Sequence, residues 1–244
     1  MANILYSNYT STSTSFLGNE RDILKVYEDM YLKYIKPLLP TQNKDSICIL
    51  DVGCGWGWGG LIKVLQQDGY TSSTGFDIST EQIETAKSLG VKNVIAQSIE
   101  QFCLDTKDGS FEYILLFDIL EHFPADKGVD LIQNMYRLLK PEGKIIIQVP
   151  NGNSLMSINF YGDITHYKAF NTSSLGQIAK MTGFQEEFYK EVLPLLPLKK
   201  KILSRFLWHL IIKPLSRIYM LATVGNSAGK VYTPNIIAVW SKKN

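Results

Sequence analysis

The feature that most constrains this chain is a glycine-dense loop that follows a short apolar strand. The segment ICILDVGCGWGWGG, residues 47–60, ends its apolar run at Asp51 and then places a glycine at every second position from Gly53 to Gly59. Because glycine has no side chain, such a loop lets a ligand lie directly against the main chain. A strand, a glycine loop and a helix in this order hold nucleotide-like molecules in α/β sheets. The loop therefore predicts an α/β fold with a bound ligand of that kind.

The composition excludes several classes of protein. The chain has 244 residues, of which 45% are hydrophobic, and a formal net charge of +2. This balance argues against bulk attraction to nucleic acid. The three cysteines lack CxxC or CxxH spacing, which predicts free thiols and neither a disulfide frame nor a zinc site. No apolar run approaches the ~20 residues that cross a bilayer, and the first residues lack a secretory pattern, so we expect a cytoplasmic protein.

Strands and helices alternate along the chain as far as residue 150, which predicts a doubly wound, mostly parallel seven-stranded sheet of the α/β class. We expect an N-terminal tail and helical cap in residues 1–45, a ligand-binding core in 46–150, and a last segment, 151–244, that carries a helical insert at 194–225, all in one domain. The expected strands are 47–52, 73–77, 93–96, 111–117, 144–149, 184–192 and 235–240, and the expected helices are 20–36, 60–68, 79–89, 130–139 and 172–181.

Two interpretations compete for the ligand of the glycine loop. Gly55, Gly57 and Gly60 satisfy G-x-G-x-x-G, and Asp77 lies about 20 residues further on, which is the spacing of a dinucleotide site. This interpretation predicts an NAD(P)-dependent oxidoreductase. The pattern is weak in so glycine-rich a segment, because many spacings of glycine occur there by chance.

The other interpretation depends on several motifs in a fixed order. Asp-Val-Gly-Cys-Gly-Trp-Gly, residues 51–57, resembles the first motif of class I S-adenosylmethionine-dependent methyltransferases. FDIS, FDILEHF and LLKPEGKIIIQVPN, at 76–79, 117–123 and 138–151, are similar to the segments that this family carries at strands two, four and five. DITHYKAF, at 163–170, resembles a segment of methyltransferases that act on small molecules and bacterial sugars. The resemblance covers about residues 45–190 and implies a Rossmann-like methyltransferase fold.

The resemblance also implies the cofactor and its contacts. S-adenosylmethionine would bind at the carboxyl ends of the strands, and S-adenosylhomocysteine would be the product. Asp77 would accept hydrogen bonds from both ribose hydroxyls, Ser98 and Ile99 would contact the adenine, and one of Trp56 and Trp58 would cover the cofactor. The residues implied in cofactor binding are Asp51, Gly53, Gly55, Gly57, Trp58, Asp77, Ile78, Ser98, Ile99 and Phe117.

The candidate catalytic residues are two histidines and a carboxylate. His166 follows the fifth strand, where such enzymes bind the acceptor, and Asp163 is placed to orient it as a general base. His122 lies beyond the fourth strand, as a second candidate or as part of the floor of the site. We see no carboxylate–histidine cluster with metal-ligand spacing and expect no metal. The candidate acceptor-binding residues are Asn151, Tyr161, Tyr167 and Lys168.

These observations predict transfer of a methyl group to a small-molecule acceptor, with a hydroxyl of a sugar or sugar nucleotide in bacterial surface-polysaccharide or related biosynthesis as the expected substrate. The alternatives are an N-methyltransferase of an amino sugar, the NAD(P)-dependent oxidoreductase, and a non-catalytic binding subunit on the same fold. We expect a small-molecule partner and no nucleic acid.

The late insert interleaves basic and apolar side chains over residues 199–217. This pattern is typical of a helix on a membrane surface, and also of a lid or a homodimer face that packs on the acceptor site. We favour the lid or dimer face. Pro214 is expected to kink or split the helix, and His209 is expected to be structural.

Overall fold

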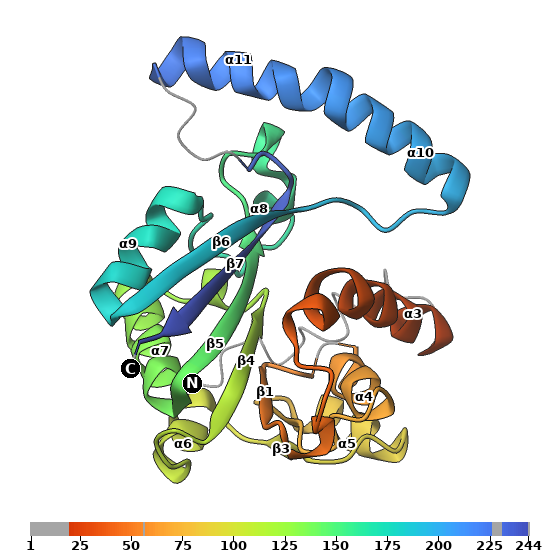
Figure 1. Ribbon diagram of the computed structural model, residues 1–244, viewed down its shortest axis with the longest axis vertical. Coiled ribbons are helices and arrows are strands. Elements are labelled where there is room, and N and C mark those ends of the chain that lie inside the picture. The colour runs from red at the N-terminus through yellow and green to blue at the C-terminus, as the bar shows by residue number, and fades with distance from the viewer. Residues whose placement is uncertain (1–19, 56, 226–230, 244) are drawn as a thin grey trace. The chain divides into compact units, whose positions relative to one another are not determined.

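The computed structural model describes residues 20–55, 57–225 and 231–243 (Figure 1). The expected tail and Trp56 therefore lie outside the described residues. The strands are β1 Ile49–Val52, β2 Thr74–Asp77, β3 Val94–Ala96, β4 Phe111–Phe117, β5 Leu139–Pro150, β6 Phe184–Val192 and β7 Asn235–Lys242.

The predicted α/β class and seven-stranded sheet are confirmed. The strand order is β3-β2-β1-β4-β5-β7-β6. The pairs β1–β2, β1–β4 and β2–β3 are parallel, whereas β7 runs antiparallel to both β5 and β6. Parallel strands bring their carboxyl ends to one edge, where ligands bind in such sheets.

The chain folds into two compact units. The first unit takes the residues up to 116 and adds 137–143, and the second takes 117–136 and the residues from 144 onward. The chain therefore passes between the units at three points of the sequence.

Polar caps set the helix starts in the first unit. Ser79 accepts a hydrogen bond from the backbone N–H of Gln82 (3.4 Å) at the start of the helix predicted at 79–89, and Ser98 accepts one from Gln101 (3.2 Å). The second of these caps opens a helix that the sequence analysis did not predict. The helices of this unit are α3 Glu20–Met30, α4 Gly60–Gln67, α5 Thr80–Ser88 and α6 Ile99–Asp105.

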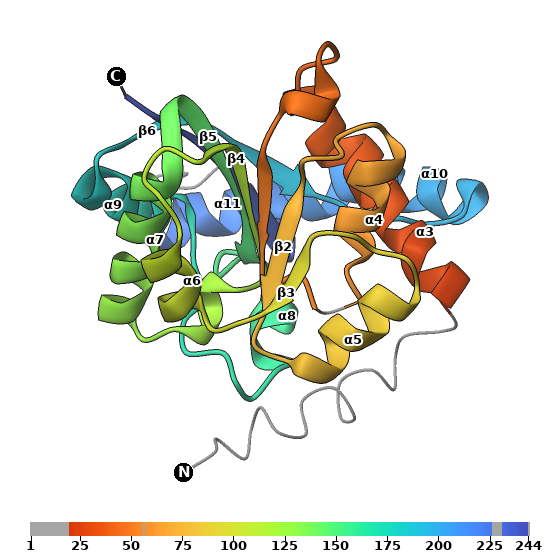
Figure 2. The ribbon, with the colours of Figure 1, turned by 90° about the horizontal axis from the view of Figure 1, so that it is seen from below.

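The expected N-terminal helix lies against the start of α4, and Figure 2 shows α3 beside α4. Tyr27 of α3 makes the contact so closely that a Cβ atom on Gly60 would lie 2.5 Å from Tyr27 Cδ2. The helix is shorter than expected, because α3 ends at Met30 and a π turn, η2 Tyr31–Ile35, follows it. A 3₁₀ turn that contains Pro37, η3 Lys36–Leu38, then ends the cap.

A cluster around Asp68 ties this cap to the end of α4. The Asp68 carboxylate accepts hydrogen bonds from Tyr31 and from Lys36 Nζ (3.1 Å), and Lys44 Nζ lies 3.1 Å from it. Burial alone would raise the pKa of this carboxyl group. The hydrogen bonds outweigh burial and lower the pKa of Asp68 to about 2.

The return segment 137–143 is tied to the first unit by two cations. Arg137 donates to the carbonyl of Thr106 (3.1 Å) and pairs with Asp108. Lys140 pairs with Glu112 of β4. The expected strand at 144–149 begins earlier than predicted, because β5 includes Leu139–Gly143, with Glu142 at φ +63°.

The second unit is built around β6 and β7. Trp240 is fully buried, with its ring centroid 5.7 Å from that of Phe184. Asn171 and Ser174 form a reciprocal capping box at the start of the helix predicted at 172–181, and Gly183 ends this helix in the left-handed region. The helices of this unit are α7 Ala125–Leu138, which starts five residues before the predicted helix, α8 Ile158–Tyr161, α9 Thr172–Thr182, α10 Leu198–Leu207 and α11 Lys213–Val224.

The insert forms one helical run in which α10 and α11 are joined by a π turn, η7 Trp208–Ile212 (Figure 1). Pro214 does not split the run; it lies in the first turn of α11, directly after the π turn η7. Trp208 packs with Leu193 and Tyr232 and is buried. No described helix is long and apolar enough to span a membrane.

Candidate functional site

The first group of candidate residues surrounds the glycine loop of the first unit. The backbone N–H groups of Gly53 and Cys54 both donate to the carbonyl of Phe76, at 2.9 and 3.0 Å, which ties the loop to β2. Gly57 lies at φ +78°, and a Cβ atom there would come within 2.3 Å of the ring of Tyr27. Gly57 and Gly60 therefore have a packing reason to be glycine. Tyr27 is a residue of this site that the sequence analysis missed.

Asp77 ends β2 and lies against Gly55. The N–H of Gly55 donates to Asp77 Oδ2 (3.0 Å), and the N–H of Ser79 donates to Oδ1 (2.8 Å). A Cβ atom on Gly55 would lie 2.6 Å from Asp77 Cγ, so only glycine fits this contact. An ionised carboxylate offers about four lone-pair sites, so Asp77 can accept a further donor beside the backbone N–H groups of Gly55, Ser79 and Ile78. Burial raises the pKa of Asp77, and the backbone donors oppose that rise.

Asp51 ends the apolar part of β1 and is almost fully buried. Burial, and then the negative charge of Asp77, raise the pKa of Asp51 to about 8. No cationic side chain of the described residues is among the causes that shift the pKa of Asp51. Two neighbouring acids without a counter-charge favour a cationic ligand, because a positive charge would stabilise both ionised forms.

The other candidate cofactor residues lie at the ends of strands and the starts of helices. Ile78 is 71% exposed directly after β2, and the partly buried Trp58 has a φ of +55° in the loop. Ser98 uses its oxygen to cap α6, and the partly buried Ile99 is the first residue of that helix. Phe117, the last residue of β4, belongs to the second unit and is partly buried. Their contacts with a cofactor stay predictions.

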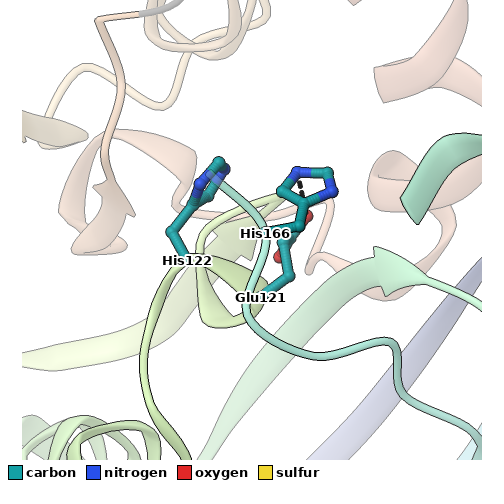
Figure 3. Close-up of side chains that lie close together, drawn as sticks. All are labelled: Glu121, His122 and His166. Atoms are coloured by element: carbon teal, nitrogen blue, oxygen red, sulfur yellow. Dashed lines mark ion pairs between the residues drawn. The ribbon is translucent and has the colours of Figure 1, made fainter. Parts of the chain in front are cut away.

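The second group of candidates surrounds Glu121 in the second unit (Figure 3). Glu121 and His122 belong to the 3₁₀ turn η5 Leu120–His122, and His166 lies on the loop that follows α8. The N–H of Tyr167 donates to the carbonyl of Glu121 (2.7 Å), which fastens this loop to η5. The turn and the loop are far apart in the sequence, and this contact brings their side chains together.

Glu121 is the most unusual residue of the group. It is fully buried, and neither carboxylate oxygen has a hydrogen-bond partner among the residues that the structure describes. Burial, and then the charge of Asp118, raise its pKa well above the ordinary value. Asp118 accepts a hydrogen bond from Gln148 Nε2 (2.8 Å), and although the residue is exposed, desolvation by the surrounding protein raises its pKa to about 6. Glu121 was not among the site residues predicted from the sequence.

His166 is oriented by the backbone. Its Nδ1 lies 2.9 Å from the carbonyl oxygen of Phe160. A carbonyl can only accept, so Nδ1 carries a proton, and in the neutral ring Nε2 keeps a lone pair. Nε2 lies 3.9 Å from Glu121 Oε1, too far for a hydrogen bond.

His122 is linked to Asp163 through a threonine. His122 Nδ1 lies 2.9 Å from Thr165 Oγ1, which donates to Asp163 Oδ1 (2.6 Å). Asp163 was expected to orient His166, whereas these bonds connect it to His122. The histidine rings lie 4.7 Å apart at 68°. Burial, and then the charge of His166, lower the pKa of His122 to about 4.

The expectation that no carboxylate–histidine cluster has ligand spacing is wrong. Glu121, His122 and His166 each offer one ligand atom, and these atoms all lie within 4.8 Å of one another. The spacing is invisible in the sequence, because His166 reaches the group only through the folding of its loop. Glu121 and His122, two of the three residues, are adjacent in the sequence.

One predicted acceptor residue has a different role. Asn151 is fully buried, and its Nδ2 donates to the carbonyls of Val231 (3.0 Å) and Thr233 (2.9 Å). Its side-chain oxygen accepts from the N–H of Asn153 (3.0 Å). Asn151 therefore holds chain segments together instead of presenting a polar group to an acceptor.

The other predicted acceptor residues are accessible. Tyr161 is 78% exposed and Tyr167 is 63% exposed. Lys168 is exposed, with its Nζ 5.8 Å from the ring centroid of Phe170. Their contacts with an acceptor stay a prediction.

Comparison with known proteins gives consistent matches. A family model described as a methyltransferase domain matches residues 25–187. An uncharacterized protein of Methanocaldococcus jannaschii is 29% identical over 204 residues, 81% of this chain and 84% of that protein. A ubiquinone biosynthesis O-methyltransferase of Haemophilus ducreyi is 29% identical over 111 residues, but this match spans only 42% of this chain and 45% of that enzyme.

The fold is also similar to that of solved structures. The crystal structure of an S-adenosylmethionine-dependent methyltransferase from Archaeoglobus fulgidus superposes with a TM-score of 0.67 at 22% identity, and the match covers 96% of this chain and 99% of that one. At this identity the likeness shows a shared fold.

Proposed function

Because the chain belongs to the methyltransferase-domain family, we propose that it transfers a methyl group from S-adenosylmethionine to a small-molecule acceptor. The observation that carries the proposal is the pair of acids at the ends of β1 and β2. Asp77 lies against the glycine loop with a lone pair left for a ribose hydroxyl, and Asp51 is an uncompensated acid that favours a cationic ligand. S-adenosylmethionine supplies a diol, an ammonium group and a sulfonium group.

The proposal accounts for the glycines better than a nicotinamide coenzyme does. Of the three glycines of G-x-G-x-x-G, Gly57 and Gly60 are required by Tyr27, and Gly55 is required by Asp77. The dinucleotide pattern therefore has a packing explanation. S-adenosylmethionine has no pyrophosphate and does not need a phosphate-binding helix start.

The acceptor that we propose is a hydroxyl of a sugar or sugar nucleotide in surface-polysaccharide or related biosynthesis. The exposed rings of Tyr161 and Tyr167 are suited to packing on a sugar face, and Lys168 is suited to a phosphate. The methyl group would leave the sulfonium, with the acceptor oxygen, methyl carbon and sulfur in line. His166 Nε2, which keeps its lone pair, can take the hydroxyl proton. An amino-sugar nitrogen is the alternative acceptor that a substrate panel would reveal.

Calorimetric titration with S-adenosylhomocysteine tests the cofactor. Asp77→Ala should weaken its binding by ~1.5–3 kcal/mol, roughly 10- to 150-fold, the worth of hydrogen bonds to a charged group. Asp126→Ala, which removes an exposed carboxylate from α7, is the matched control and should bind as the wild type does.

Three results would contradict the proposal. Equal affinity in wild type and Asp77→Ala would place the ribose elsewhere. Thermal stabilisation by NAD(P)H, with none by S-adenosylhomocysteine, would favour the oxidoreductase. Cofactor binding without turnover across a broad acceptor panel would favour the non-catalytic subunit.

A further inference from the structure

We propose that Glu121, His122 and His166 form a binding site for one divalent transition-metal ion. The inference rests on the proposed function, because the ion would act on the acceptor hydroxyl of that reaction. It is carried by the arrangement of the three side chains in the second unit (Figure 3) and by the unsatisfied carboxylate at their centre.

Glu121 supplies the first independent observation. A fully buried carboxylate with no hydrogen bond to either oxygen is costly. Most buried acids in proteins are paired, hydrogen-bonded or bound to a metal. Among the described residues the Glu121 oxygens accept no hydrogen bond, and their contact with His166 Nε2 at 3.9 Å is an ion pair only when His166 is protonated. A cation between them would satisfy both groups.

The histidines supply the second observation. Metal-ligating histidines usually donate their other ring N–H to a carbonyl or a carboxylate, which fixes the ring and its tautomer. His166 does this through the Phe160 carbonyl, and His122 is connected through Thr165 to the Asp163 carboxylate. Both imidazole rings are therefore oriented by hydrogen-bond partners in the same loop region, as the rings of metal-ligating histidines usually are.

The distances suit one small cation. Two ligand atoms that each lie ~2.1 Å from an ion can be at most about 4.2 Å apart. The 3.9 Å between His166 Nε2 and Glu121 Oε1 already meets this limit. Since all ligand atoms lie within 4.8 Å of one another, no pair needs to close by more than about 0.6 Å.

The donor set selects the kind of metal. Two imidazoles and one carboxylate suit zinc, iron(II), manganese or cobalt, whereas magnesium and calcium prefer oxygen ligands alone. Three protein ligands leave at least one position for another molecule, as in catalytic metal sites. The open position would take the acceptor hydroxyl.

The ion would change how the acceptor is activated. Bound through its oxygen, the hydroxyl would lose its proton to solvent more easily. An oxygen lone pair would then form the bond to the methyl carbon, while the carbon–sulfur bond breaks and its electron pair returns to sulfur. His166 would then act as a ligand, and the ion would replace it as the activating group.

Binding of Co²⁺ tests the site directly, because its visible absorption reports the ligand geometry. Chelator-treated protein should bind one Co²⁺ per chain in absorption and calorimetric titrations. Glu121→Gln, His122→Gln and His166→Gln should each weaken binding by at least the ~10–100-fold that loss of a second-shell partner costs. The matched controls are His209→Gln, at the exposed third histidine, and Glu81→Gln, at an exposed glutamate of α5. Both should bind Co²⁺ as the wild type does.

The remaining outcomes separate this inference from the proposed function. Absence of saturable one-to-one binding of Co²⁺ and Zn²⁺, or binding that Glu121→Gln leaves intact, would overturn the metal site. If S-adenosylhomocysteine still binds in that case, and chelator-treated protein still methylates, the proposed function stands with His166 as the base. Co²⁺ binding without any binding of S-adenosylhomocysteine would instead keep the metal site and reject the methyl donor. Circular dichroism of each variant checks that it is folded.

Discussion

At the scale of the residue, the buried Asp51 makes the stability of the folded protein depend on pH. Its folded pKa of about 8 lies above the ordinary value of 3.8, so the folded protein holds this proton more tightly than the unfolded chain does. The stabilisation is fully present below pH 3.8 and is lost as the pH rises toward and through 8. Asparagine has no proton to lose and almost the same shape.

We therefore predict that Asp51→Asn flattens the pH dependence of stability. Between pH 5 and pH 8 the wild type should lose at least ~1 kcal/mol more than the variant, because one unit of pKa shift corresponds to about 1.4 kcal/mol. Urea unfolding at several pH values measures this difference, and the variant should also bind S-adenosylhomocysteine more weakly. Parallel stability curves would show that Asp51 is ionised without penalty in the folded protein.

The roles of single residues were the hardest feature to predict from the sequence. Asp51 and Asp77 were both predicted as cofactor-binding residues, because each lies at or next to the end of a strand within a motif that resembles the methyltransferase family. Asn151 follows a strand in the same way, yet its amide is used by the carbonyls of Val231 and Thr233. Glu121 becomes a candidate site residue only because folding brings His166 within 3.9 Å of its carboxylate. Contacts between distant segments decide both cases, and no local pattern contains them.

At the scale of the element, the contact between α3 and α4 explains why the loop ends in glycine. Tyr27 occupies the space that a side chain on Gly60 would need. Gly60 is the first residue of α4, where alanine would otherwise be the better helix former.

A double-mutant cycle follows from this contact. Gly60→Ala should destabilise the wild type by more than ~1 kcal/mol, through overpacking. In a Tyr27→Ala background the same change should be neutral or stabilising, by up to about 1 kcal/mol. Urea unfolding of the four proteins gives the coupling. Equal effects of Gly60→Ala in both backgrounds would mean that Tyr27 does not lie against this position.

The Asp68 cluster gives a prediction with the opposite pH dependence. Its lowered pKa of about 2 means that its stabilisation is present above pH 3.8 and is lost as the pH falls toward 2. Asp68→Asn should therefore cost ~1–3 kcal/mol at pH 7 and reduce the loss of stability between pH 4 and pH 2. Denaturation at pH 7, 4 and 2 measures both effects. A variant as stable as the wild type at pH 7 would show that the cluster does not hold the cap.

Helices and strands could be predicted where their residues form a clear local pattern. The apolar run of β4 and the turn-bounded β6 have the predicted limits, 111–117 and 184–192. Helix α6 was missed because it is only seven residues long and buries just Phe102 and Cys103. Its cap was nevertheless visible, since Ser98 and Gln101 have the same spacing as Ser79 and Gln82.

At the scale of the whole molecule, the helical insert presents an exposed apolar and basic face. Apolar side chains along α10, η7 and α11 are exposed, among them Ile202, Phe206 and Leu210. Basic side chains lie between them, and Lys213 pairs with Glu191 (3.0 Å). We keep the proposal that this face serves as a lid or a dimer face.

Vesicle co-sedimentation tests this proposal against the membrane alternative. We expect no binding to anionic vesicles at physiological salt, since a lid or dimer face is covered by protein. Binding that weakens with added salt, and that is lost when Lys199, Lys200 and Lys201 are changed to glutamate, would establish the membrane-surface helix instead. Sedimentation equilibrium of the wild type would separate a dimer face from a lid.

The return of residues 137–143 to the first unit has a practical consequence for anyone who wishes to dissect this protein. A fragment that stops at Leu116 would leave Asp108 and Glu112 without Arg137 and Lys140. A fragment that begins at Phe117 would carry those two cations with no acidic groups to receive them. Neither half can be cut out cleanly at a single bond, so truncation is a poor route to separate donor from acceptor binding, and point substitutions are the better instrument.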